Sequence, residues 1–189
     1  MLYPNEQIFK ESLAHQLESS PYNHDVYFSE GQGKNKFRIE NTKKRVDLLL
    51  ETNPVWEHHP IFPYLAIEVK LAKSTGWLVK AIHQCKEYSE LKYAKYFIDE
   101  REIKTPPLVL LVTNHSWQFG HIYQWREPRI DYNPRYYAEG WWDGITELLD
   151  RVLWSVNVAI LRDGWFLYKQ KRYDLCTNLQ LGFNNGIKS

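Results

Sequence analysis

Three charged residues interrupt two short apolar segments of this sequence. Asp47 lies in Arg45-Val-Asp-Leu-Leu-Leu50, and Glu68 and Lys70 lie in Tyr64-Leu-Ala-Ile-Glu-Val-Lys-Leu71. Both segments have the aliphatic and β-branched composition of buried strands. Burying a carboxylate or an ammonium group is unfavourable unless the charge is paired or binds a metal ion. We therefore expect these three residues to form a functional site that combines two acids with one base.

The spacing of Glu68 and Lys70 places an acid and a base side by side. Side chains alternate between the two faces of a strand, so Val69 points to the opposite face. Two other Glu-x-Lys triplets, Glu90–Lys92 and Glu102–Lys104, fall at a predicted helix end and in a polar stretch before two prolines. A salt bridge at a sheet edge is the alternative interpretation of the Glu68–Lys70 pair.

The strand that carries Asp47 would most simply pair as the antiparallel neighbour of the strand that carries Glu68. Their carboxylates, with the Val69 carbonyl, suit a hard cation that keeps several waters, which predicts Mg²⁺, with Mn²⁺ as a substitute. The sequence has no His/Cys cluster for a softer metal. Lys70 would then hold a metal-activated water and counter the charge that develops on an attacked phosphate.

Hydrophobic spacing predicts two helices that position these strands. Residues 5–19 form the first helix, with Asn5 as its cap and Pro21 beyond its end. Residues 76–95 form the second helix, capped by Ser74 or Thr75. The predicted buried faces are Ile8, Phe9, Leu13 and Leu17 in the first helix and Leu78, Ala81, Ile82, Cys85 and Leu91 in the second.

Further strands are indicated on both sides of the second helix. Residues 25–29 and 37–39 have strand composition and flank the turn-prone Gly31-Gln-Gly33, which favours a hairpin. Residues 107–113 are strongly β-prone and predict a central strand that packs on both faces. The order of helix, strands, helix and strand predicts a mixed sheet with helices around it.

The C-terminal part of the sequence is rich in aromatic residues. Residues 117–142 interleave Trp and Tyr with three arginines, which suits either base stacking or a second small core under a long loop. Residues 143–157 are predicted to be helical. Residues 158–161 and 165–168 predict a closing hairpin with an Asp163-Gly164 turn.

Composition limits the class of protein. The 189 residues are 43% hydrophobic and 25% charged, which predicts one globular domain. No apolar run approaches the roughly 18 residues of a membrane span, and the first residues lack a secretory signal pattern, so we expect no membrane partner and a cytoplasmic location. The two cysteines, Cys85 and Cys176, are too few and too far apart to predict a disulfide framework or a zinc site.

These motifs, in this order, resemble those of the PD-(D/E)xK nuclease superfamily. The core of that superfamily is a helix, a hairpin that carries an Asp and then Glu-x-Lys, a second helix and another strand. The matching parts here are residues 5–19, Asp47, Glu68-Val-Lys70, residues 76–95 and residues 107–113. Val46 replaces the Pro of the family name. The resemblance covers about residues 1–115 and implies a single α/β restriction-endonuclease-like domain, in which residues 116–189 form an aromatic-rich C-terminal elaboration.

The resemblance also implies an activity. It points to a Mg²⁺-dependent nuclease that hydrolyses phosphodiester bonds in DNA, with an endonuclease favoured, in which Asp47, Glu68 and Lys70 are catalytic. A Glu in the first helix of that superfamily often lies near the metals, which implies a role for Glu6, with Glu11 as its rival. For Glu6, stabilisation of the helix N-terminus is the alternative interpretation.

The second helix carries a further match. Gln84-x-x-x-Tyr88 resembles the Gln-x-x-x-Tyr element of recombination helicase-nucleases, which implies that Gln84 orients Lys70 or the substrate. Lys80, Gln84 and Tyr88 recur at four-residue spacing and predict a polar stripe beside the buried one. A solvated helix face is the alternative.

Basic residues provide candidate contacts to nucleic acid. Although the formal net charge is only +1, residues 34–45 are locally basic, and phosphate contacts are made patch by patch. The candidate binding residues are Lys36, Arg38, Lys43, Lys44, Arg45, Lys73, Lys80 and Tyr88. A hairpin edge kept soluble by its lysines is the alternative.

Two other functions suit the same residues. The alternatives to a DNA nuclease are an RNA endonuclease and a catalytically inactive nucleic-acid-binding protein with this fold. A homodimer is also compatible with the predictions, because enzymes that cut both strands often pair two sites by two-fold symmetry.

Overall fold

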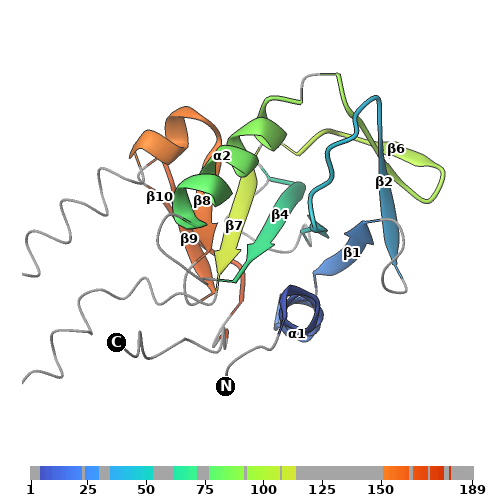
Figure 1. The fold of residues 1–189 in the computed structure, drawn as a ribbon. Helices are drawn as coiled ribbons and strands as arrows, with labels where there is room; N and C mark the ends of the chain where they lie inside the picture. The colour runs from blue at the N-terminus through green and yellow to red at the C-terminus, as the bar shows by residue number, and fades with distance from the viewer. Residues whose placement is uncertain are drawn as a thin grey trace, which may run out of the picture.

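The computed structural model describes residues 5–22, 24–29, 35–52, 62–71, 77–91, 93–106, 108–113, 151–161, 164–169, 171–176 and 179. These residues form a mixed α/β fold with helices on both faces of a central sheet (Figure 1). The predictions for the 31–33 turn, for Lys73 and for residues 117–142 lie outside the described residues. None of the described helices has the length and apolar composition that a membrane span needs.

Two of the described helices flank the strands that carry the candidate site. Helix α1 spans Glu6–Glu18, and the side chain of Asn5 accepts a hydrogen bond from the Ile8 amide at 2.9 Å, which confirms the predicted cap. Helix α2 spans Trp77–Ser89 and ends before the predicted position 95.

Within the described residues, eight strands form one sheet in the order β6-β5-β2-β1-β3-β4-β7-β8. Their bounds are β1 Asp25–Ser29, β2 Lys36–Glu40, β3 Leu48–Glu51, β4 Tyr64–Lys70, β5 Lys95–Ile98, β6 Arg101–Ile103, β7 Val109–Thr113 and β8 Val158–Leu161. Strand β4 pairs antiparallel with β3, as predicted, and parallel with β7. Two further strands, β9 Trp165–Tyr168 and β10 Lys171–Asp174, form a separate antiparallel pair.

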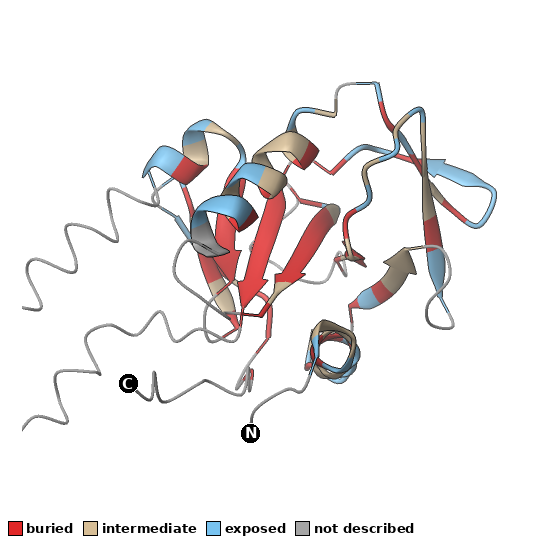
Figure 2. Ribbon diagram, in the orientation of Figure 1, coloured by how far each residue is buried: buried red, intermediate tan, exposed pale blue. Residues whose placement is uncertain are grey.

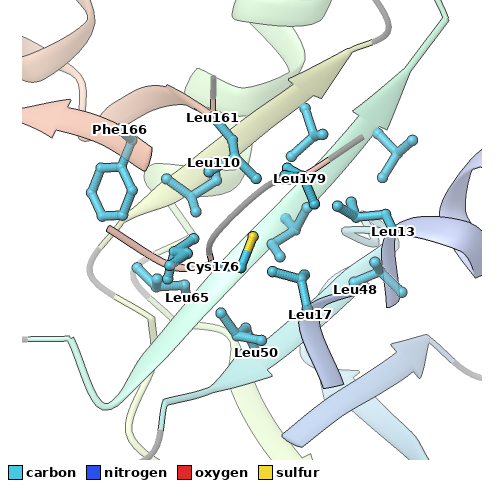
Figure 3. Packing of buried hydrophobic residues seen from close by; sticks show 14 of the residues in the cluster. Leu13, Leu17, Leu48, Leu50, Leu65, Leu110, Leu161, Phe166, Cys176 and Leu179 are labelled. Carbon is cyan, nitrogen blue, oxygen red and sulfur yellow. The ribbon is translucent and has the colours of Figure 1, made fainter. Parts of the chain in front are cut away.

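Each face of the sheet builds its own core. Leu48 and Leu50 of β3 pack with Leu13 and Leu17 of α1, in the cluster drawn in Figure 3. Leu49 points to the other face, in a second cluster that includes residues of α2. Figure 2 shows strands β4, β7 and β8 almost entirely buried. The period of two along β3 and β4 therefore decides which side chains face which helix.

Strand β7 confirms the predicted central strand. All five of its residues are buried, and it lies between β4 and β8, with which it pairs in parallel. Its near-continuous aliphatic run is typical of a parallel strand that is covered on both faces.

The predicted hairpin of residues 25–39 is wrong. Strands β1 and β2 are neighbours but pair in parallel, through Phe28 with Lys36 and Ser29 with Phe37. The antiparallel partner of β1 is β3, and that of β2 is β5. Strands β5 and β6 were not predicted, and they pair antiparallel across a turn in which Asp99 has a φ of 53°.

The predicted closing hairpin of residues 158–168 is also wrong. Strand β8 joins the large sheet beside β7, whereas β9 pairs with β10. Gly164 has a φ of 92°, and a Cβ at this position would lie 2.1 Å from the Cys176 carbonyl oxygen. Its own carbonyl accepts the amides of Leu175 and Cys176. Gly164 therefore allows close packing against the segment after β10, and Asp163 of the predicted turn lies outside the described residues.

One predicted core residue of α1 is exposed. Ile8 is 43% exposed, whereas Phe9, Leu13, Ala14 and Leu17 form the buried face. These four follow the i, i+4, i+5, i+8 spacing of a single stripe, and Ile8 lies beside it.

A core truncation tests this packing. Leu110 lies fully buried in β7, so Leu110→Ala should reduce the free energy of unfolding by about 2–5 kcal/mol through lost burial and a residual cavity. Denaturant unfolding followed by circular dichroism measures this loss. Val79→Ala is the control, because Val79 is 71% exposed and its truncation should change stability by less than about 0.5 kcal/mol. Equal losses in the two variants would contradict the core assignment.

Candidate functional site

Glu68 and Lys70 lie side by side on a central strand. The Lys70 Nζ is 2.7 Å from the Glu68 Oε1, whereas Val69 packs in the core on the α1 face. The predicted alternation along this strand is confirmed. The ion pair of the alternative interpretation is present, but β4 lies between β3 and β7, not at a sheet edge.

Asp47 lies beside this pair, just before β3. Its amide donates to the Ile67 carbonyl at 3.1 Å, so its backbone is already tied to β4. Its Oδ2 accepts the Val69 amide at 2.9 Å. The carboxylate is therefore held against the middle residue of Glu68-Val69-Lys70, which is the convergence that the sequence predicts.

Helix α1 contributes two charged groups to the same place. The Glu6 Oε2 lies 3.9 Å from the Lys70 Nζ, and the Lys10 Nζ lies 2.6 Å from the Asp47 Oδ1. Glu11 instead accepts a hydrogen bond from Gln7 at 2.6 Å, in an exposed pair. Of the two rival acids, it is Glu6 that contacts the cluster.

Lys10 is the site residue that sequence reasoning missed. The available signal was its position four residues after Glu6, which places both on one helix face. The pairing with Asp47 links residues that are far apart in the chain, so sequence spacing alone does not show it.

Burial makes Glu68 the unusual acid of the cluster. Its side chain is only 2% exposed. Burial, together with the negative charge of Asp47, raises the pKa of Glu68 to about 8, and the positive charges of Lys70 and Lys10 oppose this shift. Its Oε2 is buried and has no hydrogen-bond partner among the described residues. A buried oxygen of this kind favours a proton or a cation beside it.

Lys70 keeps its proton in this environment. Burial acts to lower the pKa of Lys70, but the charge and hydrogen bond of Glu68 outweigh burial, with further contributions from Asp47 and Glu6. The net pKa is raised. Lys70 therefore acts in this site as an ammonium group, a donor and a positive charge, not as a base.

The second helix covers the site from the α2 face. The Gln84 Nε2 donates to the Tyr88 hydroxyl at 2.6 Å. Burial and the nearby charge of Glu68 raise the pKa of Tyr88 to about 12. Lys80 is exposed, as a polar stripe requires, but that prediction is wrong for Tyr88, which is 7% exposed and packs in the core with Ala81 and Cys85.

The protein groups fit a hard divalent cation. Asp47 and Glu68 offer two carboxylates, and the buried Glu68 Oε2 has no protein donor among the described residues. Within these residues no three His, Cys, Asp or Glu side chains form a metal-binding group. These two carboxylates suit a hard cation such as Mg²⁺, because Mg²⁺ is commonly bound through one or two carboxylates and keeps several waters.

The basic candidates differ in their exposure to solvent. Arg38 pairs with Glu40 and lies over the Phe97 ring at 4.4 Å, and Lys44 pairs with Glu87 at 2.6 Å. The exposed candidates of this stretch are Lys36, Lys43 and Arg45. Strand β2, which carries Lys36 and Arg38, is flanked by β5 and β1 and is not a sheet edge, whereas Lys43, Lys44 and Arg45 follow it outside the sheet.

Comparison with known proteins gives no independent assignment. No protein-family model, curated protein or solved structure matches the chain. The function is therefore argued from the geometry of the site.

The raised pKa of Glu68 has a consequence for stability. An unfolded Glu titrates near about 4.3, so between this value and about 8 the folded protein binds more protons than the unfolded chain. Folding stability contributed by this group therefore falls as pH rises. Glu68→Gln mimics the protonated form. In EDTA, the melting temperature of Glu68→Gln minus that of the original protein should therefore increase as pH rises from about 5 to about 8.

Glu87→Gln is the matched control. The hydrogen bond from Lys44 lowers the pKa of Glu87, so Glu87 is ionised in both states throughout that range. The melting temperature of Glu87→Gln should run parallel to that of the original protein. A Glu68→Gln profile that is equally parallel would show that Glu68 is not the buried acid described.

Proposed function

We propose that this chain is a Mg²⁺-dependent nuclease that hydrolyses phosphodiester bonds in DNA and has a restriction-endonuclease-like core. The observation that carries the proposal is the bond from the Val69 amide to the Asp47 Oδ2, beside the Glu68–Lys70 pair. It brings two carboxylates and an ammonium group from neighbouring strands to one place. Metal-assisted phosphodiester hydrolysis uses these group types.

The order of elements supports the same proposal. In the chain, α1 precedes the antiparallel pair of β3 and β4, which brings Asp47 to Glu68-Val69-Lys70, and this pair is followed by α2 and then by β7, which is parallel to β4. This is the order of the PD-(D/E)xK core. Strands β1 and β2 lie between α1 and β3, and β5 and β6 lie between α2 and β7. Strands β3 and β4 bring the motifs together through backbone pairing, so the site is held by rigid elements.

Each residue has a role that follows from its surroundings. Asp47 and Glu68 would hold the cation, and the Val69 carbonyl would assist, because the N–H and C=O of a strand residue point to the same neighbour and the Val69 amide points to Asp47. The bound cation supplies Lewis acidity and an activated water. Lys70 would orient that water and stabilise the charge that develops on the phosphate.

Two helical residues support these groups. Glu6 lies close enough to Lys70 to bias the orientation of its ammonium. Gln84 would reach the substrate phosphate or Lys70 from α2, with its amide oriented by the Tyr88 hydroxyl. Tyr88, being buried, would serve through Gln84 instead of touching the nucleic acid itself.

A cleavage panel tests the activity. With Mg²⁺, the protein should cut labelled duplex DNA, and EDTA should abolish cutting. Lys70→Ala should reduce the rate by about 10²–10³, the range seen when one transition-state donor is removed. Lys86→Ala is the control, because Lys86 pairs with Glu90 on the exposed surface of α2 and should retain activity. Single-stranded DNA and RNA in parallel decide the substrate class.

The outcomes of this panel are distinct. Preferential cutting of RNA would identify an RNA endonuclease. Binding without cutting under every metal condition would identify an inactive nucleic-acid-binding protein. Cutting that survives Lys70→Ala would overturn the assignment of the site.

Carboxylate variants separate catalysis from folding. Asp47→Ala and Glu68→Ala should each abolish cleavage. Glu68→Ala should not lower the melting temperature greatly, because it removes one of two crowded negative charges. Asp47→Ala should lower the melting temperature but leave the protein folded, because it removes the acceptor of the Val69 amide and the partner of Lys10. Differential scanning fluorimetry in EDTA measures the melting temperatures. Loss of folding in either variant would indicate that the cluster serves the structure.

The basic segment gives a prediction about binding. Lys43 and Arg45 are exposed and shortly precede Asp47 in the chain, and each phosphate contact contributes about 0.9 to the slope of log affinity against log salt for duplex DNA. The double variant Lys43→Ala/Arg45→Ala should therefore reduce this slope by about 1.8, measured by fluorescence anisotropy in Ca²⁺. Lys86→Ala serves again as the control. An unchanged slope in the double variant would show that Lys43 and Arg45 do not contact phosphates.

A further inference from the structure

The two oxygens of Asp47 have different kinds of partner. The Oδ2 accepts the Val69 amide at 2.9 Å, and that donor belongs to the backbone of the central strand β4. The Oδ1 is 2.6 Å from the Lys10 ammonium, which belongs to a flexible side chain on α1. Of these two partners, only Lys10 is able to leave without disturbing the sheet.

The position of Lys10 is protected from solvent. The Lys10 and Asp47 side chains are 12% and 21% exposed. Water screens such a pair less than a surface pair, so the attraction is stronger. The positive charge of Lys10 also acts on Glu68, since it is one of the charges that oppose the raised pKa there. The Lys10 ammonium is thus a tethered cation close to both carboxylates.

A divalent cation on the same oxygen would conflict with this ammonium. Mg²⁺ binds carboxylate oxygens at about 2.0–2.1 Å, so the two cations on Oδ1 would lie within a few ångströms of each other. Like charges at this separation repel strongly in a partly buried site. Retention of both is therefore disfavoured.

We propose that Lys10 competes with the divalent cation for Asp47 and so sets the metal affinity of the site. The inference rests on the proposed function and deepens it by adding a positioning residue. Lys10 holds the Asp47 carboxylate in place and balances its charge until a divalent cation displaces the ammonium. Metal binding is then coupled to release of the first turns of α1 from Asp47.

The test measures metal binding directly. Free Mn²⁺ gives an electron paramagnetic resonance signal that is lost on binding, so titration with Mn²⁺ gives a dissociation constant that is independent of cleavage. Lys10→Met keeps the apolar stem and removes the charge, and it should tighten Mn²⁺ binding by at least about fivefold, the low end of typical coupling between two ligands. Lys10→Arg, which retains the charge, should keep the original affinity.

Lys86→Met is the matched control for the loss of one positive charge. Lys86 forms an exposed ion pair with Glu90, also at four-residue spacing on a helix, and is not part of the cluster. Its Mn²⁺ affinity should match that of the original protein. Circular dichroism confirms that each variant is folded.

Glu68→Gln separates failure of this inference from failure of the proposed function. If Glu68→Gln weakens Mn²⁺ binding but Lys10→Met binds as the original protein does or more weakly, the competition is refuted and the metal site stands. If Glu68→Gln has no effect on Mn²⁺ binding, or if no Mn²⁺ binds, both proposals fail.

The change in melting temperature that Mg²⁺ causes is a second test of the competition between Lys10 and the cation. In EDTA the Lys10 ammonium neutralises the charge of Asp47, and Mg²⁺ has to displace this ammonium in order to bind. The rise in melting temperature that Mg²⁺ causes should therefore be larger for Lys10→Met than for the original protein. Should Lys10→Met prove unfolded, Lys10→Gln takes its place with the same expected direction. An equal rise in the original protein and in the folded variant would overturn the competition.

Discussion

The burial of the Glu68 carboxylate in the centre of the sheet is the constraint on which the candidate site depends. An acid in an apolar strand is unfavourable unless a neighbour compensates its charge. Here Lys70 pairs with one oxygen, and the other has no partner among the described residues. The compensation is therefore incomplete within the described protein, which is why the position suits a proton or a cation.

The fold supplies the remaining charges from two directions. Strand pairing brings Asp47 to the Val69 amide, and α1 brings Glu6 to Lys70 and Lys10 to Asp47. The acids and bases thus alternate around one small region, and each carboxylate has an ammonium neighbour. Such an arrangement keeps a site of concentrated charge compatible with a folded core. It leaves Lys10 as the partner that a divalent cation would displace and Lys70 as the ammonium that would face a phosphate.

Local patterns predicted the elements well where one physical rule decided them. Asn5 capped α1, the alternation along β4 placed Glu68 beside Lys70, and the aliphatic run of β7 became a buried central strand. Partner choice among strands was predicted less well. The strand composition of β1 and β2 was clear, but nothing in it specified that they would lie parallel, with β3 and β5 as their antiparallel partners.

The sequence by itself determined which residues carry charge in apolar strands and which face of each strand they occupy, because a period of two is a local property of the backbone. Only the tertiary structure decided that Lys10 pairs with Asp47, that Glu6 and not Glu11 contacts Lys70, and that Tyr88 is buried. These facts depend on where α1 and α2 dock on the sheet. Docking is set by the packing of two whole faces, and a single segment does not encode it.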